Sequence, residues 1–216
     1  MHELIPSEPS ASNPNLARLN IAAQRLAPLL TDIAFVGGCV TALLITDPAA
    51  APGRTTLDVD AIIQIASYPE FTELEHRLFD LGFHRRDAAP ICRWFADDLI
   101  LDLMPTDASI LGFTNRWYKP ALEHAKPVRL GEHEIRVTAA PYFLSTKLEA
   151  FHGRGKQDFQ MSHDLEDIIT IVDGRPELVK EIAASPKDLR EYLGAEFRSL
   201  LATPAFRDGP AWSFAP

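Results

Sequence analysis

Two hydrophobic patterns alternate in the first part of the chain, one with apolar residues three or four apart and one with continuous apolar runs. The first is typical of amphipathic helices and the second of buried strands. They predict, in chain order, a helix over 15–30, a strand at Ile33–Val36, a short helix at Cys39–Ile45, a strand at Leu57–Ile65, a helix over 69–81, and strands at Ile91–Phe95, Leu99–Met104, Val128–Leu130 and Glu134–Val137. Asp97-Asp98 and Gly131-Glu132 are typical hairpin turns.

From residue 141 onward the pattern becomes helical. It predicts helices over 141–153, 163–173, 176–184 and 187–201, with Ser162 and Ser185 as N-caps. We therefore expect an α/β (α+β) protein, with a mixed sheet flanked by helices and then a C-terminal helical region. The predicted divisions are a loose arm at 1–14, an α/β domain at 15–140, the helical region at 141–203 and a tail at 204–216.

Composition narrows the class of protein. The 216 residues carry a formal charge of -9, which argues against broad, non-specific DNA or RNA binding. Two cysteines do not make a disulfide framework and suit a reducing compartment. The longest uncharged apolar run, 33–46, is too short to span a bilayer, and the N-terminal residues do not resemble a signal peptide. We expect a cytoplasmic protein with no membrane partner.

Three aspartates on predicted strands are the first candidate site. Side chains alternate along a strand, so Asp58 and Asp60 point to the same face. Asp102 is the one charge in an apolar run, and it joins them if the two strands are neighbours. Crowded carboxylates need a counter-charge, and oxygen ligands suit Mg²⁺ or Mn²⁺. The alternative is a solvated strand face; the metal hypothesis predicts phosphoryl-transfer chemistry.

A glycine pair is the second candidate. Gly37 and Gly38 lie between a predicted strand and a predicted helix, where the backbone can turn sharply and approach a ligand. Amides at the start of the following helix would suit phosphate. The alternative is a plain tight turn, since neither a P-loop nor a dinucleotide fingerprint is present.

Charged residues between 147 and 167 form the third candidate. Lys147 and Arg154 share one predicted helix face and would hold triphosphate oxygens, while Asp164 and Asp167 lie one helical turn apart. The alternative is a surface network of salt bridges. The histidines lack the paired spacing of a zinc site.

Taken in order, these motifs resemble a known superfamily. Phe35-Val36-Gly37-Gly38, Arg54-Thr55-Thr56-Leu57-Asp58-Val59-Asp60 and Leu101-Asp102-Leu103 resemble the DNA polymerase β-type nucleotidyltransferases. Lys147, Arg154 and the stretch from His163 to Ile168 are similar to the AbiEii/AbiGii toxin branch. The likeness covers roughly 30–170. Gly38 departs from the serine that many relatives carry, and the gap before Asp58 is longer than in the commonest form.

The resemblance implies a nucleotidyltransferase sheet and an NTP-dependent enzyme that releases pyrophosphate. Gly37 and Gly38 would cradle the nucleotide, Asp58, Asp60 and Asp102 would bind Mg²⁺ or Mn²⁺, and Lys147 and Asp164 would be an additional active-site pair. The acceptor would be a hydroxyl of RNA, such as tRNA, or of a protein, and the branch implies a toxin with a cognate antitoxin. Two alternatives remain: a small-molecule transferase of the antibiotic-modifying kind, and a catalytically silent nucleotide- or partner-binding module.

Overall fold

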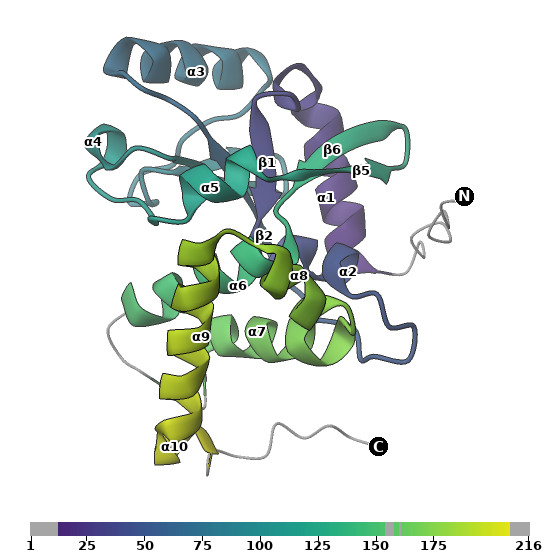
Figure 1. Ribbon diagram of the computed structural model, residues 1–216. Coiled ribbons are helices and arrows are strands. Elements are labelled where there is room, and N and C mark those ends of the chain that lie inside the picture. The colour runs from purple at the N-terminus through teal and green to yellow at the C-terminus, as the bar shows by residue number, and fades with distance from the viewer. Residues whose placement is uncertain (1–12, 154–157, 160, 208–216) are drawn as a thin grey trace.

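A six-stranded mixed sheet forms the first part of the fold (Figure 1). This computed structural model describes residues 13–153, 158–159 and 161–207. Its strands are β1 (Ile33–Val36), β2 (Asp58–Ile63), β3 (Arg93–Ala96), β4 (Leu99–Pro105), β5 (Lys126–Leu130) and β6 (His133–Val137). They lie in the order β3-β4-β2-β1-β6-β5. The predicted α/β fold class is confirmed, and each predicted strand is present.

Helices precede, interrupt and follow the sheet. They are α1 (Pro14–Arg25), η1 (Ala27–Leu29), η2 (Gly38–Val40), α2 (Thr41–Leu44), α3 (Tyr68–Asp80), α4 (Ala108–Leu111), α5 (Tyr118–Glu123), α6 (Ala140–Gly153), α7 (His163–Gly174), α8 (Leu178–Ala184), α9 (Lys187–Ala202) and α10 (Pro204–Arg207). The helix pattern did not predict α4, α5 or α10, which are too short to show a hydrophobic period.

One of the two predicted N-caps is confirmed. The Ser162 hydroxyl accepts a hydrogen bond from the Leu165 amide at the start of α7. The prediction for Ser185 is wrong, because Pro186 occupies the N-cap of α9 and makes no side-chain cap. The Ser185 hydroxyl instead donates to the Glu181 carbonyl and ends α8.

The central strands have mixed directions. β1 runs antiparallel to β2 and parallel to β6, while β2 and β4 are parallel. Val59 and Leu101 are fully buried on one face of the sheet. On the other face, Asp60 lies directly opposite Asp102 in the ladder. The alternation of side chains along the strands therefore puts the apolar residues on one side and the acids on the other.

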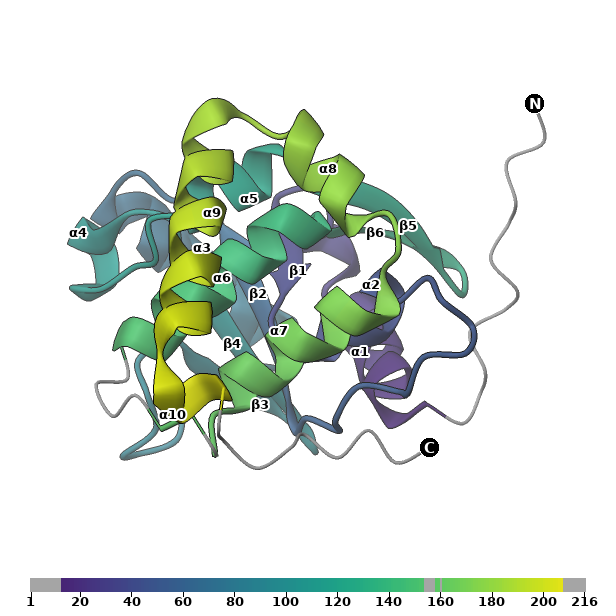
Figure 2. The same cartoon turned by 60° about the horizontal axis from the view of Figure 1, so that its bottom comes forward.

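Helices cover the sheet and continue its core. α1 packs across β2, β4 and β6, while α5 contacts β1 and β2. α6 to α9 form a helical layer beyond one end of the sheet, and Figure 2 shows α6 and α7 in front of β1 and β2. One cluster of buried apolar side chains extends from Leu16 in α1 to Leu200 in α9. Among the helices described, none is long and apolar enough to cross a membrane.

Candidate functional site

The three predicted acids lie together on neighbouring strands. Asp58 and Asp60 project from β2, and the parallel pairing with β4 places Asp102 beside Asp60. All three residues are partly buried. The Thr56 hydroxyl donates a 2.6 Å hydrogen bond to Asp58 Oδ1 and orients that carboxylate. The condition stated from the sequence, that the two strands be neighbours, is therefore met.

An arginine that the sequence analysis missed supplies positive charge to this cluster. Arg93 on β3 donates from Nε and Nη2 to the two oxygens of Asp102, both at 2.7 Å. The same Nη2 donates to Asp58 Oδ2 at 2.9 Å. The hydrogen bonds to Asp102 are the largest cause that raises the pKa of Arg93 above its already high value, so the guanidinium stays charged. The two-residue turn at Asp97-Asp98 fixes the register that pairs Arg93 with Asp102.

Local charge shows whether these residues suit a divalent cation. Asp58, Asp60 and Asp102 contribute three negative charges and Arg93 one positive charge, which leaves an excess of two negative charges. Carboxylate oxygens are the ligands that Mg²⁺ and Mn²⁺ prefer, so the donor chemistry fits such an ion. Within the described ranges, however, no group of three or more His, Cys, Asp or Glu side chains could hold a metal ion as it stands. Metal binding by the three acids stays a prediction.

Gly37 brings the backbone against the acid cluster. Its φ of +70° lies in the left-handed region, and a Cβ built there would lie 2.0 Å from Asp60 Oδ2. Only glycine meets both conditions without strain. The predicted short helix after it is present, but it is divided into η2, a single 3₁₀ turn, and α2, which has four residues. Any phosphate contact here would thus come from the amides of one turn rather than from a long helix dipole.

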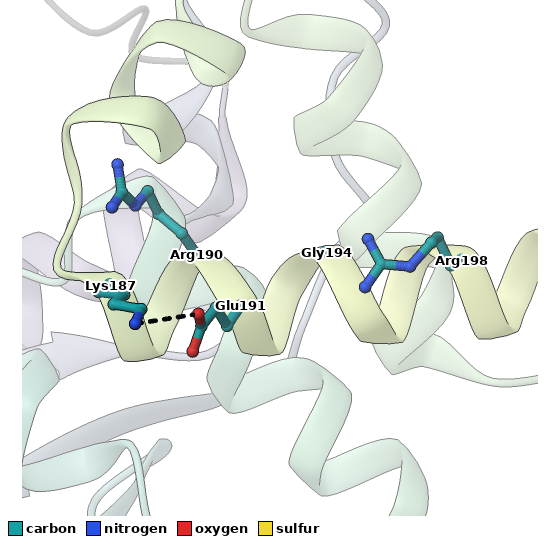
Figure 3. Close-up of a pocket in the computed structure, with 5 residues that line it drawn as sticks. All are labelled: Lys187, Arg190, Glu191, Gly194 and Arg198. Atoms are coloured by element: carbon teal, nitrogen blue, oxygen red, sulfur yellow. Dashed lines mark ion pairs between the residues drawn. The ribbon is translucent and has the colours of Figure 1, made fainter.

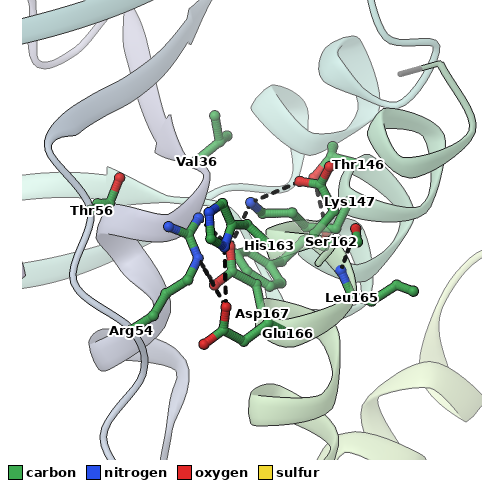
Figure 4. Close-up of polar contacts among 12 residues, drawn as sticks. Val36, Arg54, Thr56, Thr146, Lys147, Ser162, His163, Leu165, Glu166 and Asp167 are labelled. Atoms are coloured by element: carbon green, nitrogen blue, oxygen red, sulfur yellow. Dashed lines mark hydrogen bonds and ion pairs between the residues drawn. The ribbon is translucent and has the colours of Figure 1, made fainter. Parts of the chain in front are cut away.

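Lys147, Asp164, Asp167 and Arg54 form a second, buried cluster (Figure 4). The Lys147 ammonium lies 2.6 Å from Asp167 Oδ2 and 3.3 Å from Asp164 Oδ1. Arg54 donates from Nε and Nη2 to the two oxygens of Asp167, at 3.0 and 3.1 Å. The Asp164 and Asp167 side chains are only 2% and 1% exposed. This is not the surface network that the sequence left open.

The charges of this buried cluster balance. Burial lowers the pKa of Lys147, but the negative charges of Asp167 and Asp164 raise it by a larger amount. The net shift of the pKa is therefore upward, and the ammonium stays protonated. Two cations and two carboxylates give no net charge. Among these four residues the charges cancel, while the acids on β2 and β4 keep their excess; the partly exposed Glu166, 4.0 Å from Arg54 Nε, adds one more negative charge beside the buried cluster.

Local structure holds the buried cluster in place. The side chain of Asn15 in α1 donates to the Arg54 carbonyl at 2.8 Å and accepts from the Thr56 amide at 3.0 Å. This clamp fixes the end of the loop before β2, so Arg54 points to α7 while Thr56 reaches Asp58. The Ser162 cap fixes the first turn of α7, which carries Asp164.

A small pocket of about 60 Å³ joins the two clusters. The residues around it come from β1, β2, β4, α5, α6 and α7: Val36, Gly37, Asp60, Met104, Tyr118, Thr146, Lys147, Ala150 and Asp164. It thus brings together four of the predicted site residues, from both sides of the site. Gly38 lies close to Arg54, because a Cβ there would be 3.0 Å from its Nη2. The predicted nucleotide contact Arg154 lies outside the described residues.

The two cysteines are buried beside the acids. Burial and the nearby Asp60 raise the pKa of the Cys39 thiol far above its usual value, and burial and Asp102 raise that of Cys92 to about 11. Cys39 Sγ also donates to the Val36 carbonyl at 3.1 Å. Both groups are therefore neutral thiols at physiological pH, without the thiolate character of a nucleophile or zinc ligand.

A larger hollow, of about 390 Å³, lies along the exposed face of α9 (Figure 3). Lys187, Arg190, Gly194 and Arg198 line it together with Glu191, which pairs with Lys187 at 3.6 Å. It shares no lining residue with the pocket beside the acids and no aspartate faces it. Exposed arginines and lysines on one helix do not by themselves make a site.

Solved structures resemble this fold. A nucleotidyltransferase-like protein from Paracoccidioides brasiliensis, described as antigenic, matches with a TM-score of 0.55 and 19% identity, over 87% of this chain and 89% of that one. ANT(2″)-Ia, solved in complex with adenylyl-2″-tobramycin, matches with a TM-score of 0.50 and 14% identity, over 88% and 100%. No protein-family model matches the chain, and no curated protein does. The likeness therefore concerns the fold: the chain has that of nucleotidyltransferase-like proteins.

Proposed function

We propose that the protein transfers a nucleoside monophosphate from an NTP to an acceptor hydroxyl and releases pyrophosphate. The observation that carries this proposal is the acid cluster of Asp58, Asp60 and Asp102, with its two excess negative charges, on a nucleotidyltransferase-like fold. A metal-bound triphosphate would be drawn to such a cluster, whereas a free triphosphate would be repelled.

Each group has a proposed part in the reaction. The hydroxyl oxygen attacks the α-phosphorus, the bond from that phosphorus to the bridging oxygen breaks, and the electron pair leaves with pyrophosphate. Asp102 takes the hydroxyl proton, and Asp58 and Asp60 would hold Mg²⁺ or Mn²⁺ together with Asp102. When bound, the cation neutralises charge on the transferring phosphate. Gly37 and Gly38 let the backbone approach the nucleotide.

Lys147 has a more indirect part than a free phosphate-binding cation. Its ammonium already has two aspartate partners, and its side chain is 10% exposed. It also contributes to the wall of the pocket beside Asp60. We propose that Lys147 offsets the negative charge of the aspartates beside the pocket and holds α6 against α7, with Asp164 as its fixed partner.

The acceptor is the open part of the proposal. A hydroxyl of RNA, such as tRNA, or of a protein, and a toxin paired with an antitoxin, follow from the sequence likeness of the block around Lys147 and Asp164. The contact between these two residues supports their joint role. An antibiotic-type small molecule is the second candidate, since ANT(2″)-Ia shares the fold and was solved with an adenylylated tobramycin.

Label transfer from each of the four NTPs tests the proposal. Wild-type protein with Mg²⁺ or Mn²⁺ should label a component of cell RNA, cell protein or an aminoglycoside mixture. Asp60→Asn should remove nearly all transfer while the melting temperature stays close to that of the wild type, because the change is almost isosteric. Asp173→Asn, on the exposed face of α7, is the matched control and should transfer normally.

The same experiment distinguishes the enzyme from a catalytically silent binding module. Arg93 already supplies part of the charge that the acids need, so a metal-free structural cluster is the competing interpretation. Failure of the wild type to transfer label from any NTP with either metal would favour that module. Full transfer by Asp60→Asn would remove Asp60 from the reaction.

A further inference from the structure

We propose that Arg93 competes with the metal ion for the acid cluster. Its guanidinium occupies carboxylate oxygens of Asp58 and Asp102, and a metal ion can bind Asp102 only after the guanidinium has left that carboxylate. The inference rests on the proposed function, because it concerns how the same three acids take up their cation. It assigns to Arg93, on β3, a positioning role in metal loading that the sequence did not indicate.

The first argument is the geometry of the Arg93 contacts. Nη2 lies 2.9 Å from Asp58 Oδ2 and 2.7 Å from Asp102 Oδ2, so one nitrogen bridges the two carboxylates. Nε occupies the second oxygen of Asp102 at 2.7 Å. A cation that bridges the same two carboxylates would seek the same oxygens, and two positive centres cannot share that position. Metal binding at Asp102 therefore requires that Arg93 give up its two hydrogen bonds to this carboxylate.

The second argument is that the bidentate contact between Arg93 and Asp102 is strong but accessible to solvent. The pair is bidentate and charge-assisted, which makes it one of the stronger classes of hydrogen bond. Yet the side chains of Arg93, Asp58 and Asp102 are 27%, 30% and 13% exposed, whereas that of Asp167 beside Lys147 is 1% exposed. Water can reach the guanidinium after it leaves, and the incoming cation takes over the neutralisation of the less exposed Asp102.

The third argument is register. The hairpin between β3 and β4 pairs Arg93 with Asp102 across the ladder, and the ladder between β4 and β2 pairs Asp102 with Asp60. Arginine, aspartate and aspartate therefore form one row across three strands. The sheet itself places the positive charge beside the acids, so the competition does not depend on a mobile loop.

Direct measurement of Mn²⁺ binding tests the proposal. Free Mn²⁺ is followed by electron paramagnetic resonance during titration, without nucleotide, for wild type and Arg93→Gln. We expect Arg93→Gln to bind Mn²⁺ at least tenfold more tightly. Arg93→Lys keeps the charge but cannot fork to Asp102 while reaching Asp58, so we expect it to bind with intermediate affinity. If Arg93→Gln fails to fold, Arg93→Lys alone tests the proposal against the wild type.

Arg85→Gln is the matched control. It removes one positive charge from a neighbouring segment, but the Arg85 guanidinium lies over the Trp94 ring, and Trp94 points to the opposite face of β3. Its Mn²⁺ affinity should equal that of the wild type, which separates the fork from a general change in net charge.

The outcomes distinguish this inference from the proposed function. Equal Mn²⁺ affinity in wild type and both Arg93 variants would overturn the competition and leave the transferase intact. Weaker binding by the variants would also overturn it and would make Arg93 an organiser of the carboxylates. Absence of Mn²⁺ binding in all the proteins, with and without NTP, would overturn the proposed metal site and this inference with it.

Discussion

Replacement of Lys147 by methionine should destabilise the fold strongly. Methionine keeps most of the apolar stem but removes the ammonium that lies between Asp164 and Asp167. The sequence alone suggested a phosphate-binding lysine whose loss leaves the fold intact. Because the ammonium and both aspartates are buried, the structure predicts a stability defect instead.

The magnitude follows from the distances. With an effective dielectric constant of about 20, the attraction of Lys147 to Asp167 at 2.6 Å is about 6 kcal/mol, and that to Asp164 at 3.3 Å is about 5 kcal/mol. Desolvation offsets these gross attractions by several kcal/mol for each ion. Removal of one partner strands carboxylates in the interior, and such changes cost about 3–5 kcal/mol. In the variant Asp167 keeps its two hydrogen bonds from Arg54, which limits the loss at that carboxylate.

Urea unfolding at pH 8, followed by circular dichroism, measures the change in the free energy of unfolding. The matched control is Lys187→Met, whose ion pair with Glu191 is 3.6 Å long and exposed. That change should cost at most about 0.5 kcal/mol. A Lys147→Met cost as small as that of the control would refute the conclusion that these charges are paired in the interior.

The pH dependence gives a second check with a defined sign. The pKa of Lys147 is raised above its ordinary 10.5, because its aspartate partners outweigh the effect of burial. The stability that Lys147 contributes is therefore fully present below pH 10.5 and is lost as the pH rises through the higher value in the fold. The gap in stability between wild type and Lys147→Met should narrow only above pH 10.5. A gap that narrows between pH 7 and 9 would contradict this assignment.

Three further predictions follow from the site. Gly37→Ala should abolish most label transfer, because the added Cβ would displace a site carboxylate. Gly112 has a similar φ of +78° but open space around it, so Gly112→Ala should keep full activity and lose only about 1–2 kcal/mol of stability. Arg54→Lys should lower the free energy of unfolding by about 1.5–3 kcal/mol, since lysine cannot fork to Asp167; unchanged urea midpoints would contradict this. Cys92, with its pKa near 11, should react with a disulfide reagent at pH 8 much more slowly in the folded protein than in urea, and equal rates would contradict its burial.

The sequence predicted the strand side of the site well, because strand periodicity is a short-range property. Alternation alone placed Asp58 and Asp60 on one face, and the structure adds only that β4 is the neighbour of β2. Arg93 was within reach of the same reasoning. The hairpin turn at Asp97-Asp98 was predicted, and counting outward from it pairs Arg93 with Asp102.

The helical side was not predictable in the same way. Helix periodicity indicated that Lys147 and Asp164 lie on helices, but not that α6 and α7 turn these side chains into a shared interior. Arg54 stood in a motif of the resemblance, but the sequence assigned it no role, since it lies in a loop and its position depends on the distant Asn15. Burial of charges depends on how separate elements pack, and no local pattern encodes that packing.

The contact between Arg54 and Asp167 has a consequence for how the protein is made. The two residues are 113 positions apart, and this pair closes a loop that contains five of the six strands, β2 to β6. On the ribosome, all six strands and the three strand acids are synthesised before α7. Until then Lys147 lacks both aspartates, and the loop before β2 lacks its anchor in α7. Because contacts so distant in sequence form slowly, we expect the contact between Arg54 and Asp167 to be among the last of the site to form.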